Sequence, residues 1–208
     1  MDLKYFHHYK NKALKTRSIS TSILKLLSLA AVSFLMYSCD GNITKSNNGN
    51  DLISYFNAQA RKTVDENTAI HLLPVVIDSG KKQWENNDVY NWRSGFWPGI
   101  EWYLYESTKD DYWKKAAEKS TEQLIAVIDT TVSNHDLGFQ FYCSYGNGYR
   151  LTGNPAYKQV LLRAADSLAR LYNPNVGTIL SWPGRVKEKG WPHNTIIDNM
   201  MNLELLFW

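Results

Sequence analysis

The stretches YESTKDDYWKKAAEKSTEQLIAVI (residues 105–128) and YRLTGNPAYKQVLLRAADSLARLY (residues 149–172) align at an offset of 44 residues. In each, a short polar turn, TKDD or TGNP, precedes a helical pattern with apolar residues at i, i+3, i+4 and i+7. In the first stretch these positions are Trp113, Ala116, Ala117, Ser120, Leu124, Val127 and Ile128. The repeat predicts two amphipathic helices, each entered through the same kind of turn.

A glycine-aromatic element lies before each turn, WRSGFWPGIEWYLY in the first unit and HDLGFQFYCSYGNGY in the second. The repeating unit is therefore predicted to be a hairpin of two helices, which buries its faces only by stacking on neighbouring hairpins. A lead-in helix is expected at about residues 52–70. A third unit begins at IIDNMMNLELLFW (residues 196–208), after a stretch expected to be irregular (residues 173–194). The sequence thus predicts an all-α array of hairpins over residues 51–208.

The apolar pattern of the third unit is still continuing at Trp208. No polar terminal helix follows, although an array of hairpins needs one to remain soluble. We therefore expect the chain to hold about the first half of its fold and to expose apolar faces when it is alone.

The N-terminal residues 1–38 carry a basic lead followed by the apolar run LLSLAAVSFLMY (residues 26–37). This is the pattern of a signal peptide, because the apolar run is too short to span a bilayer comfortably. The motif LMYSC resembles a bacterial lipobox and predicts lipidation of Cys39, with an uncleaved anchor or an ordinary signal as the alternatives. Residues 39–50 are then a flexible tether. The prediction is an exported lipoprotein, periplasmic or outer-membrane-associated, held to the membrane only by its lipid.

The basic charge of the whole chain belongs to this leader. The leader holds six of the 23 basic and one of the 20 acidic side chains, which leaves 17 against 19 and a formal charge of −2. This charge gives no support for a nucleic-acid partner. All eight tryptophans follow the leader, and aromatic excess in an exported, non-basic protein favours carbohydrate binding, although core packing also uses such rings.

Asp136 and Asp198 occupy matching places, each directly before the inner helix of its unit, in HDLGF and IIDNMMNL. One interpretation is helix capping, since an aspartate at a helix start accepts backbone N–H bonds. The other is acid catalysis, since paired carboxylates in different environments supply one proton donor and one ionised neighbour. We expect apolar surroundings for both. No His/Cys cluster has metal-ligand spacing, so neither a metal nor another cofactor is predicted.

The segments NWRSGFWPGIEWYLYESTKD, HDLGFQFYCSYGNGYRLTGN and SWPGR…IIDNMMNLELLFW together resemble glycoside hydrolase family 88, the unsaturated glucuronyl hydrolases. The resemblance runs from about Ile53 to the end of the chain. It implies an (α/α)6 toroid of six helical hairpins, here about its first half. It also implies substrates left by polysaccharide lyases, glycosaminoglycan-type oligosaccharides with a C4=C5 double bond in the non-reducing uronic acid.

The resemblance also implies residue roles. Asp198 corresponds to the family's general acid and base, which protonates C4 and assists addition of water at C5, after which the hemiketal opens and the rest of the sugar leaves. Asp136 corresponds to a second aspartate that orients the substrate and biases the pKa of the acid. Trp92 and Trp182 correspond to tryptophans lining the sugar subsite. His135 is interpreted as making a structural hydrogen bond.

Three other interpretations stay open at this stage. A non-enzymatic glycan-binding lipoprotein would share the export signal, the helices and the aromatic excess, but gives no reason for two matched aspartates. The unsaturated rhamnogalacturonyl hydrolases are the nearest enzymatic alternative, although HDLGF favours the glucuronyl family. An inactive remnant is the third.

Overall fold

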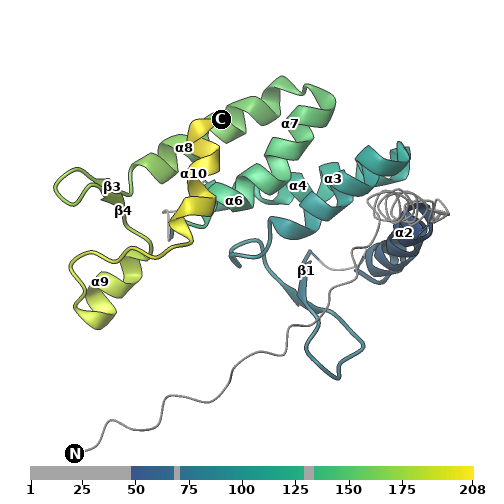
Figure 1. Ribbon diagram of the computed structural model, residues 1–208, viewed down its shortest axis with the longest axis horizontal. Coiled ribbons are helices and arrows are strands. Elements are labelled where there is room, and N and C mark those ends of the chain that lie inside the picture. The colour runs from purple at the N-terminus through teal and green to yellow at the C-terminus, as the bar shows by residue number, and fades with distance from the viewer. Residues whose placement is uncertain (1–47, 68–70, 129–133) are drawn as a thin grey trace, which may run out of the picture. The chain divides into compact units, whose positions relative to one another are not determined.

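The computed structural model describes residues 48–67, 71–128 and 134–208, which form mostly helices (Figure 1). The predicted leader and the lipidation site Cys39 lie outside these residues. The last three residues of the predicted tether, 48–50, lie in the first described helix. In chain order the elements before the second repeat are α2 (Asn48–Asn67), β1 (Leu73–Val76), β2 (Glu85–Asn87), α3 (Phe96–Thr108), α4 (Asp111–Gln123) and α5 (Ile125–Ile128). They are followed by α6 (Leu137–Phe141), the π-helical turn η1 (Tyr142–Gly146), α7 (Asn147–Thr152), α8 (Pro155–Ala169), β3 (Tyr172–Asn173), β4 (Thr178–Ile179), α9 (Pro183–Lys189) and α10 (Asn199–Phe207).

The 44-residue repeat is confirmed at its turns. Helices α3 and α7 both end at a residue with left-handed backbone, Lys109 (φ 58°) and Gly153 (φ 68°). The next residue starts the outer helix and caps it: Asp110 accepts from the Tyr112 N–H of α4, and Asn154 does the same at the start of α8. Two positions 44 residues apart in sequence therefore fold through the same local hydrogen bonds.

The helices of the two hairpins bury one aromatic face between them. Trp113 on α4 and its repeat partner Tyr157 on α8 are both buried, 0% and 3% exposed. The indole N–H of Trp102 on α3 donates to the Thr121 hydroxyl of α4 at 2.9 Å, and that of Trp113 donates to Asn57 on α2 at 2.7 Å. Each buried ring thus packs its apolar body while its N–H finds an acceptor.

The all-α prediction is correct for the main elements, and the chain adds two small antiparallel sheets, β1–β2 and β3–β4. The stretch 173–194, expected to be irregular, contains β4, half of the second sheet, and α9. The tight Asn173–Gly177 turn makes the short hairpin possible, since Gly177 has φ 78°. This hairpin carries Ile179 and Ser181 to the start of α10.

The third unit begins as predicted, with α10 packed against α6. A Cβ at Gly138 would lie 2.6 Å from the backbone of Asn202, so only glycine allows this approach of the two helices. The Asn202 side chain then accepts from the Phe139 N–H of α6 at 2.9 Å and donates to the Asp198 carbonyl at 3.1 Å. This contact sets the starts of two inner helices side by side.

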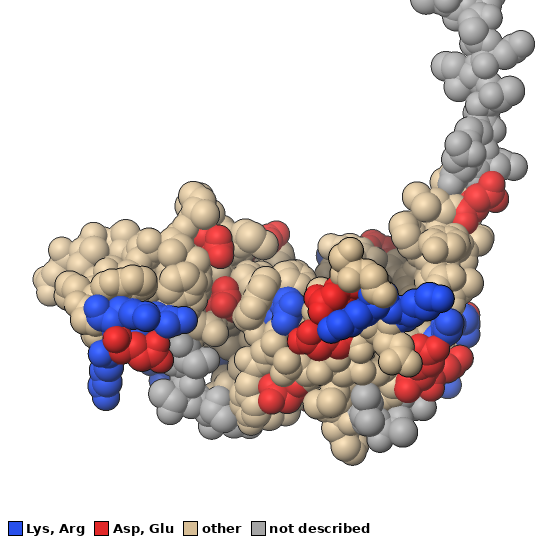
Figure 2. All heavy atoms as spheres, turned by 90° about the horizontal axis from the view of Figure 1, so that it is seen from below, with Lys and Arg blue, Asp and Glu red and all other residues tan. Residues whose placement is uncertain are grey.

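On the face drawn in Figure 2, acidic and basic side chains are intermingled. Among the ion pairs, Arg61–Asp110 and Arg150–Glu106 join different elements of the fold. Arg150 and Glu106 occupy equivalent positions of the repeat, and their bidentate contact of 2.6 and 2.8 Å ties α7 to α3.

Candidate active site

Asp136 lies at the start of α6 and is buried, at 8% exposed. Its side chain makes no capping hydrogen bond to the helix. Its backbone N–H donates to the Asn134 side chain at 2.8 Å, and its carboxylate lies 3.5 Å from Nε2 of the preceding residue, His135. The capping interpretation therefore fails at this position, because the carboxylate faces the imidazole instead of the helix.

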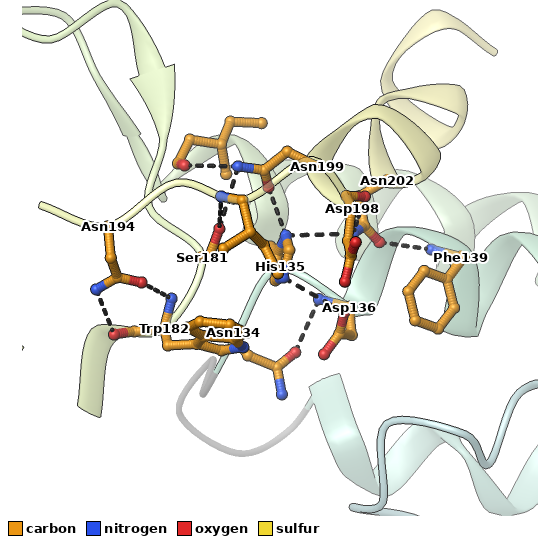
Figure 3. A network of polar contacts seen from close by, with 12 residues as sticks. Asn134, His135, Asp136, Phe139, Ser181, Trp182, Asn194, Asp198, Asn199 and Asn202 are labelled. Carbon is orange, nitrogen blue, oxygen red and sulfur yellow. Dashed lines mark hydrogen bonds and ion pairs between the residues drawn. The ribbon is translucent and has the colours of Figure 1, made fainter. Parts of the chain in front are cut away.

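Asp198 occupies the same place at the start of α10 and likewise makes no capping hydrogen bond. Asp136 is buried, but its partners Asn134 and His135 are polar, and Asp198 is exposed, so the expectation of apolar surroundings is wrong for both acids. The residues flanking Asp198, Ile197 and Met200, turn outward and are 81% and 66% exposed. Figure 3 shows the carboxyl groups of Asp198 and Asp136 directed to the same side of the His135 ring. The fold has thus brought together two acids that are 62 residues apart in the sequence.

The two acids have different environments. Burial raises the pKa of Asp136 above its usual value; the His135 ring opposes this rise, and the negative charge of Asp198 adds to it. A hydrogen bond from Asn202 also opposes the rise. Asp136 is therefore the acid of the pair that resists ionisation, while the exposed Asp198 is open to an incoming ligand.

A buried polar network surrounds His135, which is only 1% exposed. Its Nδ1 lies 2.5 Å from Asn199 Oδ1, and its backbone N–H donates to the Ser181 carbonyl at 3.0 Å. The structural hydrogen bond predicted for His135 is confirmed, and Figure 3 shows its partners converging from α10 and the loop after β4. Sequence reasoning missed Asn199 and Asn202. The available signal was their spacing of three residues within an apolar helix, which places two amides on one buried face.

The two tryptophans predicted to line the sugar subsite lie near the acids. Trp92 is 49% exposed and packs edge-on against Phe139 of α6, with ring centroids 6.1 Å apart. Trp182 stands perpendicular to the His135 ring at 6.0 Å. Their role in sugar binding stays a prediction.

A third acid, Glu101 on α3, is buried at 1% exposed and lies apart from the pair. Burial raises its pKa to about 8, with hydrogen bonds from Ser120 and Trp97 and the charge of Lys119 acting in the opposite direction. Its Oε2 has no hydrogen-bond partner and borders a small cavity of about 60 Å³. Sequence reasoning missed this acid, because its burial arises where α3 packs on α4.

A larger groove of about 690 Å³ lies beside α10, lined mainly by apolar residues such as Ile179, Met200 and Leu203. Neither aspartate lines it, so it is not the acid-bearing site.

Within residues 48–67, 71–128 and 134–208, no group of three or more His, Cys, Asp or Glu side chains is placed to hold a metal ion. In the same part of the chain, no helix has both the length and the apolar character needed to cross a membrane.

No family model matches the chain. An unsaturated glucuronyl hydrolase of Formosa agariphila is 41% identical over 118 residues, which are 56% of this chain and 29% of that protein. An unsaturated chondroitin disaccharide hydrolase of Streptococcus pneumoniae is 32% identical over 123 residues, 58% of this chain and 31% of that protein. The chain thus spans about a third of the curated relatives it matches.

Among solved structures, an unsaturated glucuronyl hydrolase specific for heparin superposes with a TM-score of 0.64 and 33% identity, over 76% of this chain and 42% of that one. The fold is therefore that of part of the helical toroid of these proteins. More particularly, the curated homologues of the chain are unsaturated glucuronyl hydrolases and unsaturated chondroitin disaccharide hydrolases. The resemblance inferred from HDLGF and IDNMMNL is confirmed as a match to part of these glycosidases.

Proposed function

We propose that this chain carries the acid-bearing part of a hydrolase that removes the unsaturated uronic acid from lyase-generated glycosaminoglycan oligosaccharides. The observation that carries the proposal is a pair of aspartates, Asp136 and Asp198, that lie at the adjacent starts of α6 and α10 without capping either helix. A protein that only bound glycans would need the exposed tryptophan, but it would not need a buried acid held against a second one. The homologues named above supply the substrate class.

The proposed reaction is a hydration. Asp198 gives its proton to C4 of the C4=C5 enol ether, which leaves an oxocarbenium-like centre at C5 stabilised by the ring oxygen. Water adds to C5 and returns a proton to the carboxylate, so the net change is the addition of one water. The hemiketal formed at C5 opens, and the rest of the oligosaccharide leaves from C1 as an alcohol.

The roles of the neighbouring groups follow from their positions. Exposed Asp198 can reach a substrate atom. Buried Asp136 lies in the wall of the site, where it contacts the substrate and where its protonation state changes the pKa of Asp198. The half-exposed face of Trp92 supplies a surface on which a sugar ring can stack.

The test is an assay of the natively expressed protein on unsaturated chondroitin, heparin and rhamnogalacturonan disaccharides, in which the loss of the ultraviolet absorbance of the double bond measures turnover. Calorimetric titration of the same disaccharides runs beside it. Turnover that needs Asp198 supports the proposal. Binding without turnover would instead identify a glycan-binding protein, and turnover only on unsaturated rhamnogalacturonan would identify the other hydrolase class.

A further inference from the structure

The side-chain amide of Asn199 can point in only one direction. Its Nδ2 donates to the carbonyl oxygen of Ile179 at 2.9 Å and lies 3.2 Å from the Ser181 hydroxyl. A flipped amide would set its own carbonyl against that of Ile179, with two acceptors facing each other. Because the NH₂ group is committed to Ile179, Oδ1 is the atom that faces His135.

The orientation of Asn199 determines which ring nitrogen of His135 carries a proton. An amide oxygen only accepts, so a 2.5 Å contact between Asn199 Oδ1 and His135 Nδ1 requires a proton on Nδ1. The Asn202 Nδ2 also lies 3.4 Å from this nitrogen, but the same amide donates to the Asp198 carbonyl at 3.1 Å and to the Asp136 carboxyl group, which accounts for its two N–H groups. The shorter contact therefore decides the tautomer.

The opposite nitrogen, Nε2, lies 3.5 Å from Asp136 Oδ1. With Nδ1 protonated, a neutral ring presents a lone pair at Nε2, and an ionised carboxylate opposite it would place acceptor against acceptor in a buried site. A proton between the two atoms removes this conflict, whether it belongs formally to the imidazole or to the carboxyl group. Among the described residues, the charged or titratable groups that act on Asp136 are His135 from its own loop and Asp198 from α10.

We propose that Asn199 is a positioning residue that fixes the proton of His135 on Nδ1, so that Nε2 faces Asp136 and one of these two groups carries a further proton. The functional consequence rests on the hydrolase proposed above. The substrate is itself a carboxylate, and two ionised aspartates would repel it. This further proton neutralises one negative charge of the site while leaving Asp198 free for proton transfer.

The test is nitrogen NMR of the full chain with ¹⁵N-labelled histidine. The chain has five histidines, and replacing the other four with glutamine leaves a single imidazole signal set. In the neutral ring, Nδ1 of His135 is expected to carry the proton. A ring protonated on Nε2 alone, with a bare Nδ1, would overturn the proposal, and circular dichroism checks that the protein with the four replacements keeps its fold.

Two substitutions at Asn199 separate the hydrogen-bonding effect of its side-chain oxygen from the effect of its packing. In Asn199→Asp an acceptor still faces Nδ1, so the Nδ1 proton is retained, whereas in Asn199→Leu it is released to Nε2. Asp136→Asn is the matched control. Because the proposal assigns the tautomer of His135 to Asn199, the Nδ1 proton should persist in the Asp136→Asn variant. A tautomer that follows Asp136 and ignores Asn199 would contradict it.

These spectra need no substrate, so their outcome is independent of whether the proposed hydrolase activity is found. Where that activity is present, Asn199→Leu should also displace the pH profile of kcat, and Asn199→Asp should bring it back toward the original. An Asn199→Leu variant with reduced turnover but an unchanged profile would leave Asn199 a packing residue and refute its positioning role.

Discussion

The outer and inner helices of the hairpins begin in different ways, although the residues at the starts are similar. Asp110 and Asn154 begin the outer helices α4 and α8 with extended backbone, ψ 121° and 112°, and their side chains cap the helix. Asp136 and Asp198 begin the inner helices α6 and α10 with helical backbone, ψ −12° and −19°, and cap nothing. A capping side chain folds back on the helix only from the extended conformation. The inner aspartates are therefore free to face the site.

This difference shows how one residue type serves two purposes within a repeat. At the outer turns an exposed polar side chain satisfies backbone donors that the helix leaves open. At the inner starts the first turn is held by contacts from other elements, such as Asn202 on the Phe139 N–H. Tertiary contacts replace the cap and release the carboxylate.

The largest effect is expected for Asp198→Asn in the natively expressed protein. The substitution keeps the size of the side chain but removes the transferable proton, so turnover of unsaturated disaccharide should fall at least about 10²-fold. Loss of absorbance measures the rate, and circular dichroism checks that the fold is retained. Turnover close to that of the unmutated protein would exclude Asp198 as the donor.

Glu101→Gln tests an acid that lies at neither kind of helix start. Its pKa is raised from 4.5 to about 8 in the folded protein, so the native state binds more protons than the unfolded state between these values. The contribution of Glu101 to stability is therefore greatest below about pH 4.5 and declines as the pH rises to about 8. Urea unfolding across this range should show the decline in the unmutated chain and not in the variant. Parallel curves would mean that Glu101 is not buried as a neutral acid.

Asp136→Asn should lower turnover about tenfold, less than the change at Asp198, because the residue acts through orientation and charge. The pH profile should also move. In the unmutated protein, loss of the proton beside Asp136 at higher pH leaves a negative charge that raises the pKa of a neighbouring acid, so the variant, which never carries that charge, should show the alkaline limb governed by that acid at lower pH. Rates measured from acid to alkaline pH check this, and an unchanged rate and profile would remove Asp136 from the site.

The smallest effect concerns the caps and tests the comparison directly. Asp110→Ala and Asn154→Ala should each cost about 1 kcal/mol of unfolding free energy, because each removes a side-chain acceptor from a helix start. Asp198→Ala is the matched control at an inner start and should change stability by less than about 0.5 kcal/mol. Denaturant titration measures all three. Equal losses at inner and outer positions would mean that the aspartates at the inner starts also cap their helices.

Much of the fold could be predicted from the sequence because it depends on local patterns. The apolar spacing after TKDD and TGNP gave helices α4 and α8, and the polar residues at the turns gave their caps. Leu124 and its repeat partner Leu168 are both fully buried, as the alignment requires. The two short sheets were not predicted, since strands of two to four residues carry too little pattern to be distinguished from loops.

The sequence by itself determined the 44-residue repeat, the order of inner and outer helices, and the matched places of Asp136 and Asp198. The tertiary structure decided what these aspartates do, because the same residue before a helix can cap it or face away from it. It also placed Asn199 against His135, a contact between residues 64 positions apart, and buried Glu101 between α3 and α4. Helix periodicity and turn chemistry act over a few residues and can be read locally. Burial and the direction of a hydrogen bond depend on which distant segments meet, and no local pattern contains that information.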